Sequence, residues 1–464
     1  MVERNAALNA DKMTPAERRA ALSLASIFAL RMMGLFMIYP VFSLYAHQLR
    51  GVTPTTIGLA LGIYGLAQTL LHIPLGMLSD RVGRKPVITL GLLVFAAGSV
   101  IAALSQSIHG VILGRLLQGG GAVGSSMLAL NADLTREEHR TKAMAVIGIT
   151  IGMSSVAAVA LGPVLNRWIG VPGIFWLTAI LALFAIGVLL FVVPRPAHST
   201  LHRDTEPVPT LFRRVLSDGQ LLRLDFGIFA LHAILTASFV VLPLVLTHIH
   251  GLSAHDQWYV YLPILTVSVF AMVPFIIVAE KRRRMKPVFV SAVLVVCLAE
   301  LALMEWHRSL PAIILALLVF FTAFNLLEAS LPSLISKVAP AESKGTAMGV
   351  YSSSQFLGIF VGGTAGGWLY GHHGVAGVFA FSTLVALAWL LLAATMKNPR
   401  YLSSYLLNVG RVSAQEADRL AARLARVPGV AEAVVIADDG VAYLKVDSGA
   451  LDEAALREFS TAGV

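Results

Sequence analysis

The sequence is poor in charge and in cysteine. Of its 464 residues only 13% are charged and 57% are hydrophobic, and the mean hydropathy is +0.77. Soluble globular proteins carry roughly 25% charged residues, so this composition excludes an ordinary soluble domain and favours a membrane protein. The single cysteine, Cys297, lies inside an apolar segment, which excludes disulfides and cysteine-pair metal sites.

Three other patterns are missing. No GxxxxGK[ST] loop that would cradle phosphates occurs, so ATP is not expected to supply energy. No CxxC pair occurs in the C-terminal segment, which excludes a thiol-based metal carrier. The first twenty residues mix charges and lack the apolar core and cleavage site of a signal peptide. We therefore predict no cleaved signal, no cofactor, no metal site and no enzymatic activity.

Long apolar runs dominate what remains. Runs of about 20 residues cross a bilayer as helices, and the sequence predicts twelve of them. Their expected ranges are 22–46, 55–78, 87–106, 109–132, 142–166, 172–194, 224–248, 257–279, 287–306, 310–335, 345–369 and 375–396.

Lysine and arginine concentrate in alternate loops between these spans. This bias places the basic side, together with both chain termini, in the cytoplasm. The bias also explains the formal net charge of +9, so no nucleic-acid partner is predicted. Examples are Arg81, Arg84, Lys85 and Lys281 to Arg284 on the basic side, against essentially Arg50, Arg167 and Arg308 on the other.

Two loop sequences recur about 200 residues apart. SDRVGRKPV at 79–87 corresponds to AEKRRRMKPV at 279–288, and REEHRTKAMAVIG at 136–148 corresponds to PAESKGTAMGVYS at 340–352. Each pair follows the same helix of a six-helix half, and such a duplication is typical of transporters. The expected parts are a cytoplasmic N-terminus (1–21), a first half (22–194), a linker with an amphipathic helix (195–223), a second half (224–397) and a C-terminal domain (401–464).

The C-terminal segment has its own secondary-structure pattern. Ser413 and Glu416 form a capping box at the start of a helix with one apolar face. Asp438-Asp439-Gly440 is a hairpin turn signal. The expected strands are 402–409, 430–437 and 441–446, with helices at 413–427 and 451–459. The order βαββα resembles a ferredoxin-like domain without its last strand.

The charge of this domain opposes that of the membrane face above it. Residues 411–464 contain six basic and nine acidic residues, which leaves three excess negative charges. Complementary fields favour docking. We expect the basic runs 281–284 and 213–214 to be the partners.

Ionisable residues inside the predicted spans are costly and usually functional. Those singled out are Arg31, His72, Arg115, His232, Glu300 and Glu328. These residues also have structural explanations. Arg115 could snorkel to the surface, Arg31 could be a structural partner of Glu328, and the histidines could be packing residues. Glu300 and Glu305, toward the outer end of a peripheral helix, are expected to be structural or interfacial. Candidate substrate contacts are Tyr39, Tyr64, Gln68 and Asn325.

Several motifs resemble those of the major facilitator superfamily, and within it the twelve-span drug:proton antiporter group. They are GMLSDRVGRKPVI at 76–88, GRLLQGGGA at 114–122, GLFMIYP at 34–40 and Gly162-Pro163. Ser43 replaces a proline of the first-helix motif, and Leu165-Asn166 stand near where the helix-5 motif ends in glycines. With the C-terminal domain included, the resemblance is greatest to YajR-type transporters and covers nearly the whole chain.

The resemblance implies an all-α membrane protein with a twelve-helix fold of two six-helix halves, plus a small α+β ferredoxin-like cytoplasmic domain. The central cavity would be lined by helices 1, 4, 7 and 10. Residues expected in proton coupling or the cavity are Arg31, His72, Arg115, Gln118, His232 and Glu328. Residues expected in a conformational latch against the start of helix 11 are Gly76, Asp80, Arg81, Gly83, Arg84, Lys85 and Gly345. Gly162 and Pro163 form the helix-5 motif.

The function expected is proton-driven export of small molecules by alternating access, as a monomer in the lipid bilayer of the inner membrane. The alternatives are an uncoupled facilitator or importer, and a membrane sensor that signals through the C-terminal domain. The substrate is not predicted.

Overall fold

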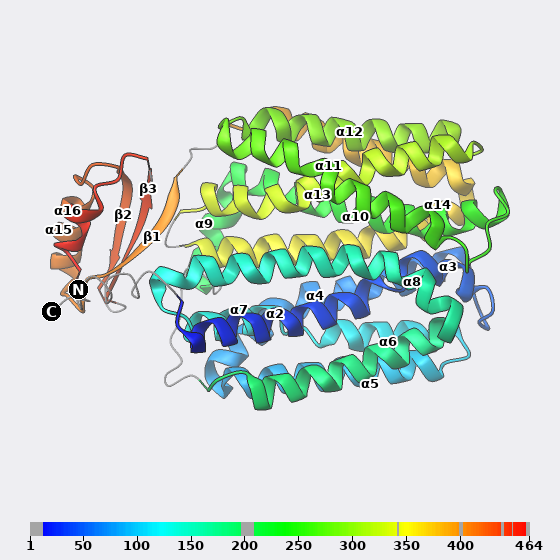
Figure 1. Cartoon of the computed structure of the whole chain (residues 1–464), viewed down its shortest axis with the longest axis horizontal. Coiled ribbons are helices and arrows are strands. Elements are labelled where there is room, and N and C mark those ends of the chain that lie inside the picture. Colours follow the sequence, from blue (N-terminus) through cyan, green and yellow to red (C-terminus); the bar gives the residue numbers. More distant parts are fainter. Residues whose placement is uncertain are drawn as a thin grey trace.

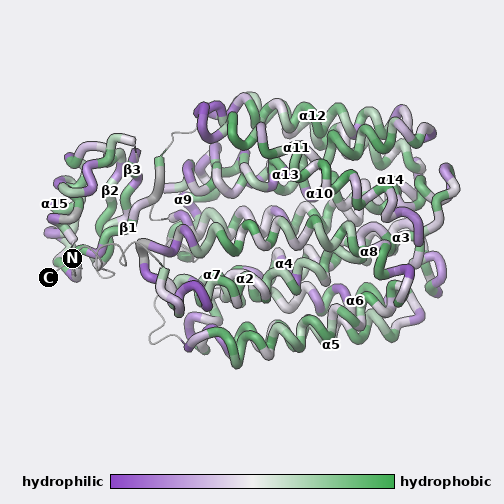
Figure 2. Tube along the Cα trace, in the orientation of Figure 1, coloured by the Kyte–Doolittle hydropathy of each residue, from purple (hydrophilic) through white to green (hydrophobic). Residues whose placement is uncertain are grey.

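The computed structural model consists of a bundle of long helices with a small mixed domain at one end (Figure 1). It describes residues 13–195, 208–340, 343–398, 402–437, 440–447 and 449–460. Hydrophobic residues run along the length of the bundle, whereas hydrophilic residues gather at its two ends (Figure 2). We call the end that faces the small domain the C-domain end, and the other the distal end.

The first half of the bundle is built from helices on the N-terminal side of the linker. They are α2 (Pro15–Phe36), α3 (Tyr39–Ala46), α4 (Pro54–Val82), α5 (Arg84–Leu104), α6 (Ile108–Gly120), α7 (Gly124–Asp133), α8 (Glu137–Gly187) and the π-helical turn η1 (Val188–Val192). The second half contains α10 (Gly219–His248), α11 (Trp258–Lys281), α12 (Met285–Trp306), α13 (Leu310–Val338) and α14 (Lys344–Ala394).

Breaks within these helices account for the twelve predicted spans. Among the described residues, nine helical segments are long and apolar enough to cross a membrane. Two of them belong to the 51-residue helices α8 and α14, which turn at Gly170 and Gly374, each with φ of 66°. A straight helix of that length would measure about 75 Å, more than twice the hydrocarbon thickness of a bilayer. Each therefore makes two spans, and α6 with α7 makes one more.

Two boundaries differ from the sequence-based expectation. The first helix begins at Pro15 rather than 22, because Thr14 and Glu17 form a capping box that starts the helix early. The amphipathic helix expected in the linker is reduced to a 3₁₀ turn η2 (Pro209–Leu211) and the six-residue α9 (Phe212–Ser217). It stops there because the Asp218 side chain accepts from the backbone N–H groups of Gln220 and Leu221, and so caps α10.

Small residues bring the helices into close contact. A Cβ atom on Gly358 of α14 would lie 2.2 Å from the carbonyl oxygen of Phe229 on α10. The two halves meet in the same manner, because a Cβ atom on Gly58 of α4 would lie 2.0 Å from the Gly363 carbonyl oxygen of α14. Helices that lack a side chain at the contact approach until their backbones touch. The halves are thus tightly packed along α4 and α14.

The C-terminal domain is a three-stranded antiparallel sheet with two helices. Its elements are β1 (Ser403–Asn408), α15 (Ala414–Leu424), β2 (Val430–Ile436), β3 (Val441–Val446) and α16 (Glu453–Arg457). The strand order is β1-β3-β2, with β3 between its two neighbours. This order matches the predicted ferredoxin-like fold without its fourth strand. Its core includes Leu407, Leu424 and Leu444. The predicted turn residues Asp438 and Asp439 lie outside the described residues.

This domain touches the bundle at several points. The Lys445 ammonium donates to the Ser336 carbonyl oxygen at the end of α13, over 2.5 Å. Arg283, from the predicted basic run, lies 3.6 Å from Asp447 in a nitrogen-to-oxygen ion pair. Strand β1 packs against both α8 and α13. The domain therefore contacts both halves of the bundle.

Candidate functional site

A polar cluster is buried in the first half around two arginines. Arg31 of α2 donates to the Gly121 carbonyl oxygen over 3.0 Å, and to the Tyr64 hydroxyl over 3.4 Å. Arg115 of α6 donates to the Gln118 side-chain oxygen over 2.8 Å. The Arg115 guanidinium also lies 5.0 Å from the centre of the Tyr64 ring. Arg31 is 3% exposed and Arg115 fully buried, so neither snorkels.

The break in the fourth span positions Arg31. Residues 121–123 between α6 and α7 are non-helical. The Gly121 carbonyl oxygen faces Arg31 there and accepts its hydrogen bond. The alternative that Arg31 is the ion-pair partner of Glu328 is therefore not what the structure shows. Glu328 lies with a different set of residues in the second half.

That second cluster joins three helices. His232 of α10 and Gln355 of α14 lie 2.9 Å apart between their side-chain nitrogens. Gln355 also donates to a carboxylate oxygen of Glu328 on α13, over 3.4 Å. The His232 Nδ1 atom lies 3.3 Å from the Ile228 carbonyl oxygen, which can only accept, so Nδ1 carries the proton. The Nε2 atom is then free to accept from the Gln355 amide.

Glu328 is the more accessible of the two titratable members of this second cluster. Its side chain is 28% exposed, against 1% for His232, and the two lie 3.9 Å apart between nitrogen and oxygen. A partly exposed carboxyl that accepts from one neighbouring helix and lies beside another can exchange protons and follow helix movements. Gln355 was not singled out from the sequence, because it belongs to no motif and lies on helix 11, outside the four helices expected to line the cavity.

Among the described residues the His72 side chain forms no hydrogen bond with either cluster, although it lies within electrostatic range of Arg31. Its ring packs 6.0 Å from the Phe356 ring of the opposite half, between centroids, and the residue is 6% exposed. The Ser125 hydroxyl donates to the His72 backbone carbonyl oxygen over 2.7 Å. This arrangement favours the packing role for His72.

Two buried carboxyl groups lie elsewhere in the second half. Glu300 of α12 is fully buried, and the Ser238 hydroxyl lies 3.2 Å from both of its oxygens. This contact agrees with the structural role expected for Glu300. Asp225 of α10, which sequence reasoning missed, is 5% exposed, and neither of its carboxylate oxygens has a hydrogen-bond partner among the described residues. Because Asp225 lies near the start of a predicted span, the sequence indicated a surface residue.

The loop between α4 and α5 is tied to its own half. Gly83 has φ of 104°, a conformation that favours glycine, and turns the chain between the helices. Arg84 forms ion pairs with Asp80 and with Asp133 of α7, the latter at 3.2 Å. Lys85 donates to the Val193 carbonyl oxygen over 2.6 Å.

The remaining latch residues lie on α4 and at the start of α14. Arg81 is exposed, and Gly345 is buried at the start of α14. A Cβ atom on Gly76 would lie 2.7 Å from the Ser125 hydroxyl oxygen of α7. The turn at the equivalent place in the second half contains Arg283 with φ of 52°, which is the one non-glycine residue with positive φ among the described residues.

The helix-5 motif has a packing explanation. A Cβ atom on Gly162 would lie 2.2 Å from the Met37 carbonyl oxygen and 3.0 Å from Pro40. Met37 lies at the break between α2 and α3. Pro163 follows inside α8. Glycine at 162 is thus required where the fifth span crosses the kinked first span.

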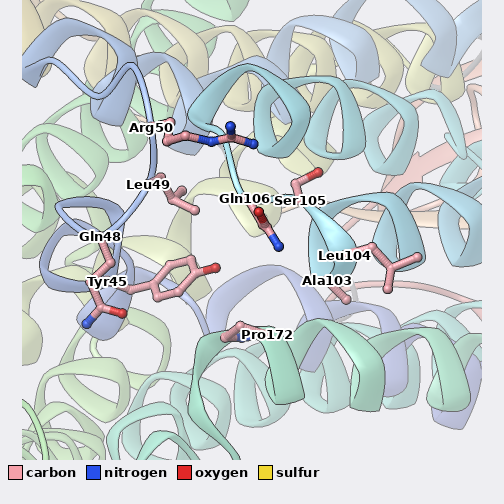
Figure 3. Close-up of a pocket in the computed structure, with 9 residues that line it drawn as sticks. All are labelled: Tyr45, Gln48, Leu49, Arg50, Ala103, Leu104, Ser105, Gln106 and Pro172. Atoms are coloured by element: carbon pink, nitrogen blue, oxygen red, sulfur yellow. The ribbon is translucent and has the colours of Figure 1, made fainter.

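A groove of about 500 Å³ lies at the distal end, away from both clusters. Figure 3 shows the Tyr45 ring and the Gln106 side chain pointing into it. None of the predicted site residues contributes to its lining, which is Tyr45, Gln48, Leu49, Arg50, Ala103, Leu104, Ser105, Gln106 and Pro172.

Comparison with known proteins agrees with this architecture. The family model of the Major Facilitator Superfamily matches residues 24–363 and 266–411. The inner membrane transport protein YajR of Escherichia coli (strain K12) is 47% identical over 442 residues, which are 95% of this chain and 97% of that protein. The multidrug resistance protein MdtH of Yersinia enterocolitica is 25% identical over 372 residues, 77% of this chain and 90% of that protein.

A solved structure shares the fold. It is a bacterial homologue of the human lysosomal transporter Spinster, in an inward-facing and occupied conformation, with a TM-score of 0.69 and 14% identity. The match covers 83% of this chain and 98% of that one. The matched family and the identity to a transport protein along almost the full length are decisive: this chain is a multi-pass inner-membrane transporter of the major facilitator superfamily, and it is not an enzyme.

Proposed function

We propose that this transporter exports small molecules in exchange for protons by alternating access, as a monomer with both termini in the cytoplasm. The observation that carries the proposal is the Glu328 cluster. One partly exposed carboxyl accepts from Gln355 and lies 3.9 Å from His232, so it meets residues of helices 7 and 11 from its place on helix 10. A titratable group in contact with several helices can couple proton binding to their movement.

Two further facts support the direction of transport and the orientation of the protein in the membrane. A multidrug resistance protein is among the relatives, which favours export. Basic residues collect at the C-domain end, so this end is assigned to the cytoplasm. The C-domain end and the distal end are then the cytoplasmic and periplasmic ends.

The test is transport in proteoliposomes that contain the purified chain and carry an imposed pH gradient. Substrates for it come from a growth screen of a strain that lacks the transporter against a panel of antimicrobial compounds. Export that follows the pH gradient supports the proposal. Movement that follows only the substrate gradient indicates a facilitator, and the absence of movement for every compound in the panel indicates a sensor.

Neutralising Asp80 is expected to impair transport more than it impairs the amount of protein in the membrane. In Asp80→Asn, Arg84 still donates hydrogen bonds to Asp133 and to the Ser79 hydroxyl, so the loop stays folded. What is lost is a carboxylate that can meet the start of helix 11 in one conformation. Such a contact contributes roughly 0.3–2 kcal/mol, enough to shift a balanced two-state equilibrium. The measurement is transport rate per mole of inserted protein.

The duplication provides a matched control for this variant. Glu280 occupies the equivalent position in the second half and forms an exposed ion pair with Lys337 at 2.8 Å. Exposed pairs contribute about 0–1 kcal/mol, so Glu280→Gln is expected to have little effect. Equal transport rates in Asp80→Asn and the wild type, at equal abundance, would remove Asp80 from the latch.

Docking of the C-terminal domain is expected to weaken with salt and to strengthen as pH rises. The Arg283–Asp447 pair is exposed and therefore screened by salt. Burial, and then the nearby charge of Lys344, lower the pKa of Lys445 from 10.5 to about 8, against an opposing effect of Glu432. Lys445 therefore loses its proton at lower pH in the docked form than in the undocked form. This difference favours docking as pH rises from about 8 toward 10.5. Below that window both forms are protonated, and Lys445 adds no pH dependence.

Energy transfer between fluorescent labels on α15 and α12 would report this docking. A chain that ends at Asn398 serves as the functional comparison, because the last span is complete by Ala394. We expect it to insert and transport at an altered rate. Complete loss of transport in a well-inserted truncation would place the domain within the transport cycle, and an unaltered salt profile of transport would remove its regulatory role.

A further inference from the structure

Asp225 faces α14 from a stripe of close helix contacts. Cβ atoms on Gly358, Gly362 and Gly366 would each lie under 3 Å from backbone atoms of α10, at Phe229, Ala233 and Ala237 respectively. Residues four apart share a helix face. Asp225 lies four residues before Phe229 on α10, and Ser354 lies four residues before Gly358 on α14. The same stripe of contacts therefore pairs Asp225 with Ser354. Asp225 is thus level with the turn of α14 that contains Tyr351 and Gln355.

Three groups in this region lack hydrogen-bond partners among the described residues. They are both carboxylate oxygens of Asp225, the Tyr351 hydroxyl and one carboxylate oxygen of Glu328. Asp225 is 5% exposed and Tyr351 is 3% exposed. The Tyr351 hydroxyl lies within electrostatic range of both carboxyl groups. A buried carboxylate without donors is costly, whereas a carboxyl that gains and loses a proton during a cycle avoids that cost in one state.

Titratable groups on three helices lie in this part of the bundle. Tyr351 belongs to α14, Glu328 to α13, and His232 lies two turns farther along α10. The described part of the chain gives Asp225 no ion pair with a basic side chain. The α10 helix begins at Gly219, so Asp225 is about 9 Å along it. Glu328 is about 15 Å from the same end of the bundle, at the end of α13. Asp225 therefore lies between Glu328 and the cytoplasm.

We propose that Asp225 is a second proton-binding carboxyl of this transporter, which takes the proton from Glu328 through the Tyr351 hydroxyl and releases it to the cytoplasm. In a conformation in which the Tyr351 hydroxyl bridges the two carboxyl groups, the protonated Glu328 gives its proton to the Tyr351 oxygen, while the hydroxyl proton of Tyr351 passes to the Asp225 carboxylate. Tyr351 ends neutral, Glu328 ends ionised and Asp225 ends protonated. The inference rests on the proposed proton coupling, to which it adds the exit side of the proton path.

Infrared difference spectroscopy tests this without a substrate. The full chain is purified, placed in lipid nanodiscs and titrated, and the carbonyl band of protonated carboxyl groups is followed. Bands lost in Asp225→Asn and in Glu328→Gln identify the two groups. Asp225→Asn is expected to move the midpoint of the Glu328 band to lower pH, on the order of one pH unit, because a neighbouring negative charge is gone. The exposed Glu305 provides the control Glu305→Gln, which should leave both bands in place.

Tyr351→Phe tests the relay while keeping both carboxyl groups, and it stays informative if Asp225→Asn does not fold. Both bands are expected to remain, but proton release after a pH jump, followed with a pH-sensitive dye, should slow. Tyr261→Phe is the matched control, because Tyr261 is also buried with an unpartnered hydroxyl but lies on α11. Slowing in Tyr351→Phe alone supports the relay, and equal rates in the two variants overturn it.

Two spectral outcomes separate this inference from the proposed function. A Glu328 band that titrates while no Asp225 band does, or that does not respond to Asp225→Asn, overturns the inference and leaves proton coupling in place. A Glu328 band that does not titrate in the wild type overturns the proposed coupling, and the relay with it.

Discussion

Replacing Glu328 with glutamine is expected to abolish pH-driven transport while leaving a folded protein in the membrane. Glutamine has nearly the same shape and retains an oxygen that can accept from Gln355, so the contact at 3.4 Å is conserved. It cannot bind or release a proton in the working range. The two protonation states on which the conformational equilibrium would depend are therefore lost. Substrate binding that does not involve the carboxyl charge should persist.

The measurement is substrate flux into proteoliposomes with and without a pH gradient, at equal reconstituted protein. Glu305→Gln is the control, since Glu305 is exposed at the distal end of α12. Normal coupling in Glu328→Gln would exclude Glu328 as the proton carrier. The histidines His72 and His232 would then be the next candidates.

A leucine at position 58 is expected to stop transport without reducing the amount of folded protein. The new Cβ atom would lie 2.0 Å from the Gly363 carbonyl oxygen and 2.8 Å from the Gly367 backbone. Both partners belong to the other half of the molecule. Because the two halves move relative to each other in alternating access, the clash is relieved by keeping them apart at this end. The protein should then be trapped open toward the periplasm.

The same substitution within one half should act differently. A Cβ atom on Gly98 of α5 would lie 2.5 Å from the Gly114 carbonyl oxygen of α6. These helices belong to the same half, so the overpacking is relieved only by disrupting the fold, at a cost of about 1–3 kcal/mol or more. Gly98→Leu is therefore expected to lower the yield of folded protein. Gly148→Leu should leave both transport and the yield of folded protein unchanged, because nothing lies within 4 Å of a Cβ atom at this position.

Size-exclusion yield, transport rate and thiol labelling at a cysteine introduced on the periplasmic side distinguish these outcomes. Increased periplasmic labelling with normal yield is expected for Gly58→Leu alone. A loss of yield in Gly58→Leu as large as that in Gly98→Leu would show that the α4–α14 contact belongs to the folded core and not to a moving interface.

The sequence alone determined the membrane architecture, because hydropathy is a local property. Each span needs about 20 apolar residues whatever its neighbours are, so the twelve ranges could be read one at a time. The two halves followed from a repeat in the loops, and the small domain from its strand and helix periods. The breaks at Gly170 and Gly374 could not be distinguished from ordinary loops, since only the structure shows each as a single positive-φ residue inside an otherwise continuous helix.

The tertiary structure decided which polar residues meet. Arg31 and Glu328 are both ionisable and both lie on central helices, so the sequence allowed an ion pair between them. In the structure Arg31 donates to the Gly121 carbonyl oxygen in the first half, and Glu328 accepts from Gln355 in the second half. Asp225 was missed because its burial depends on α14 packing against α10, and Gln355 because nothing in the sequence shows that it meets His232 and Glu328. Partner choice depends on which side chains the packing of the helices brings together, 90 positions apart for Arg31 and Gly121 and 27 for Glu328 and Gln355, and a hydropathy pattern contains no information about such contacts.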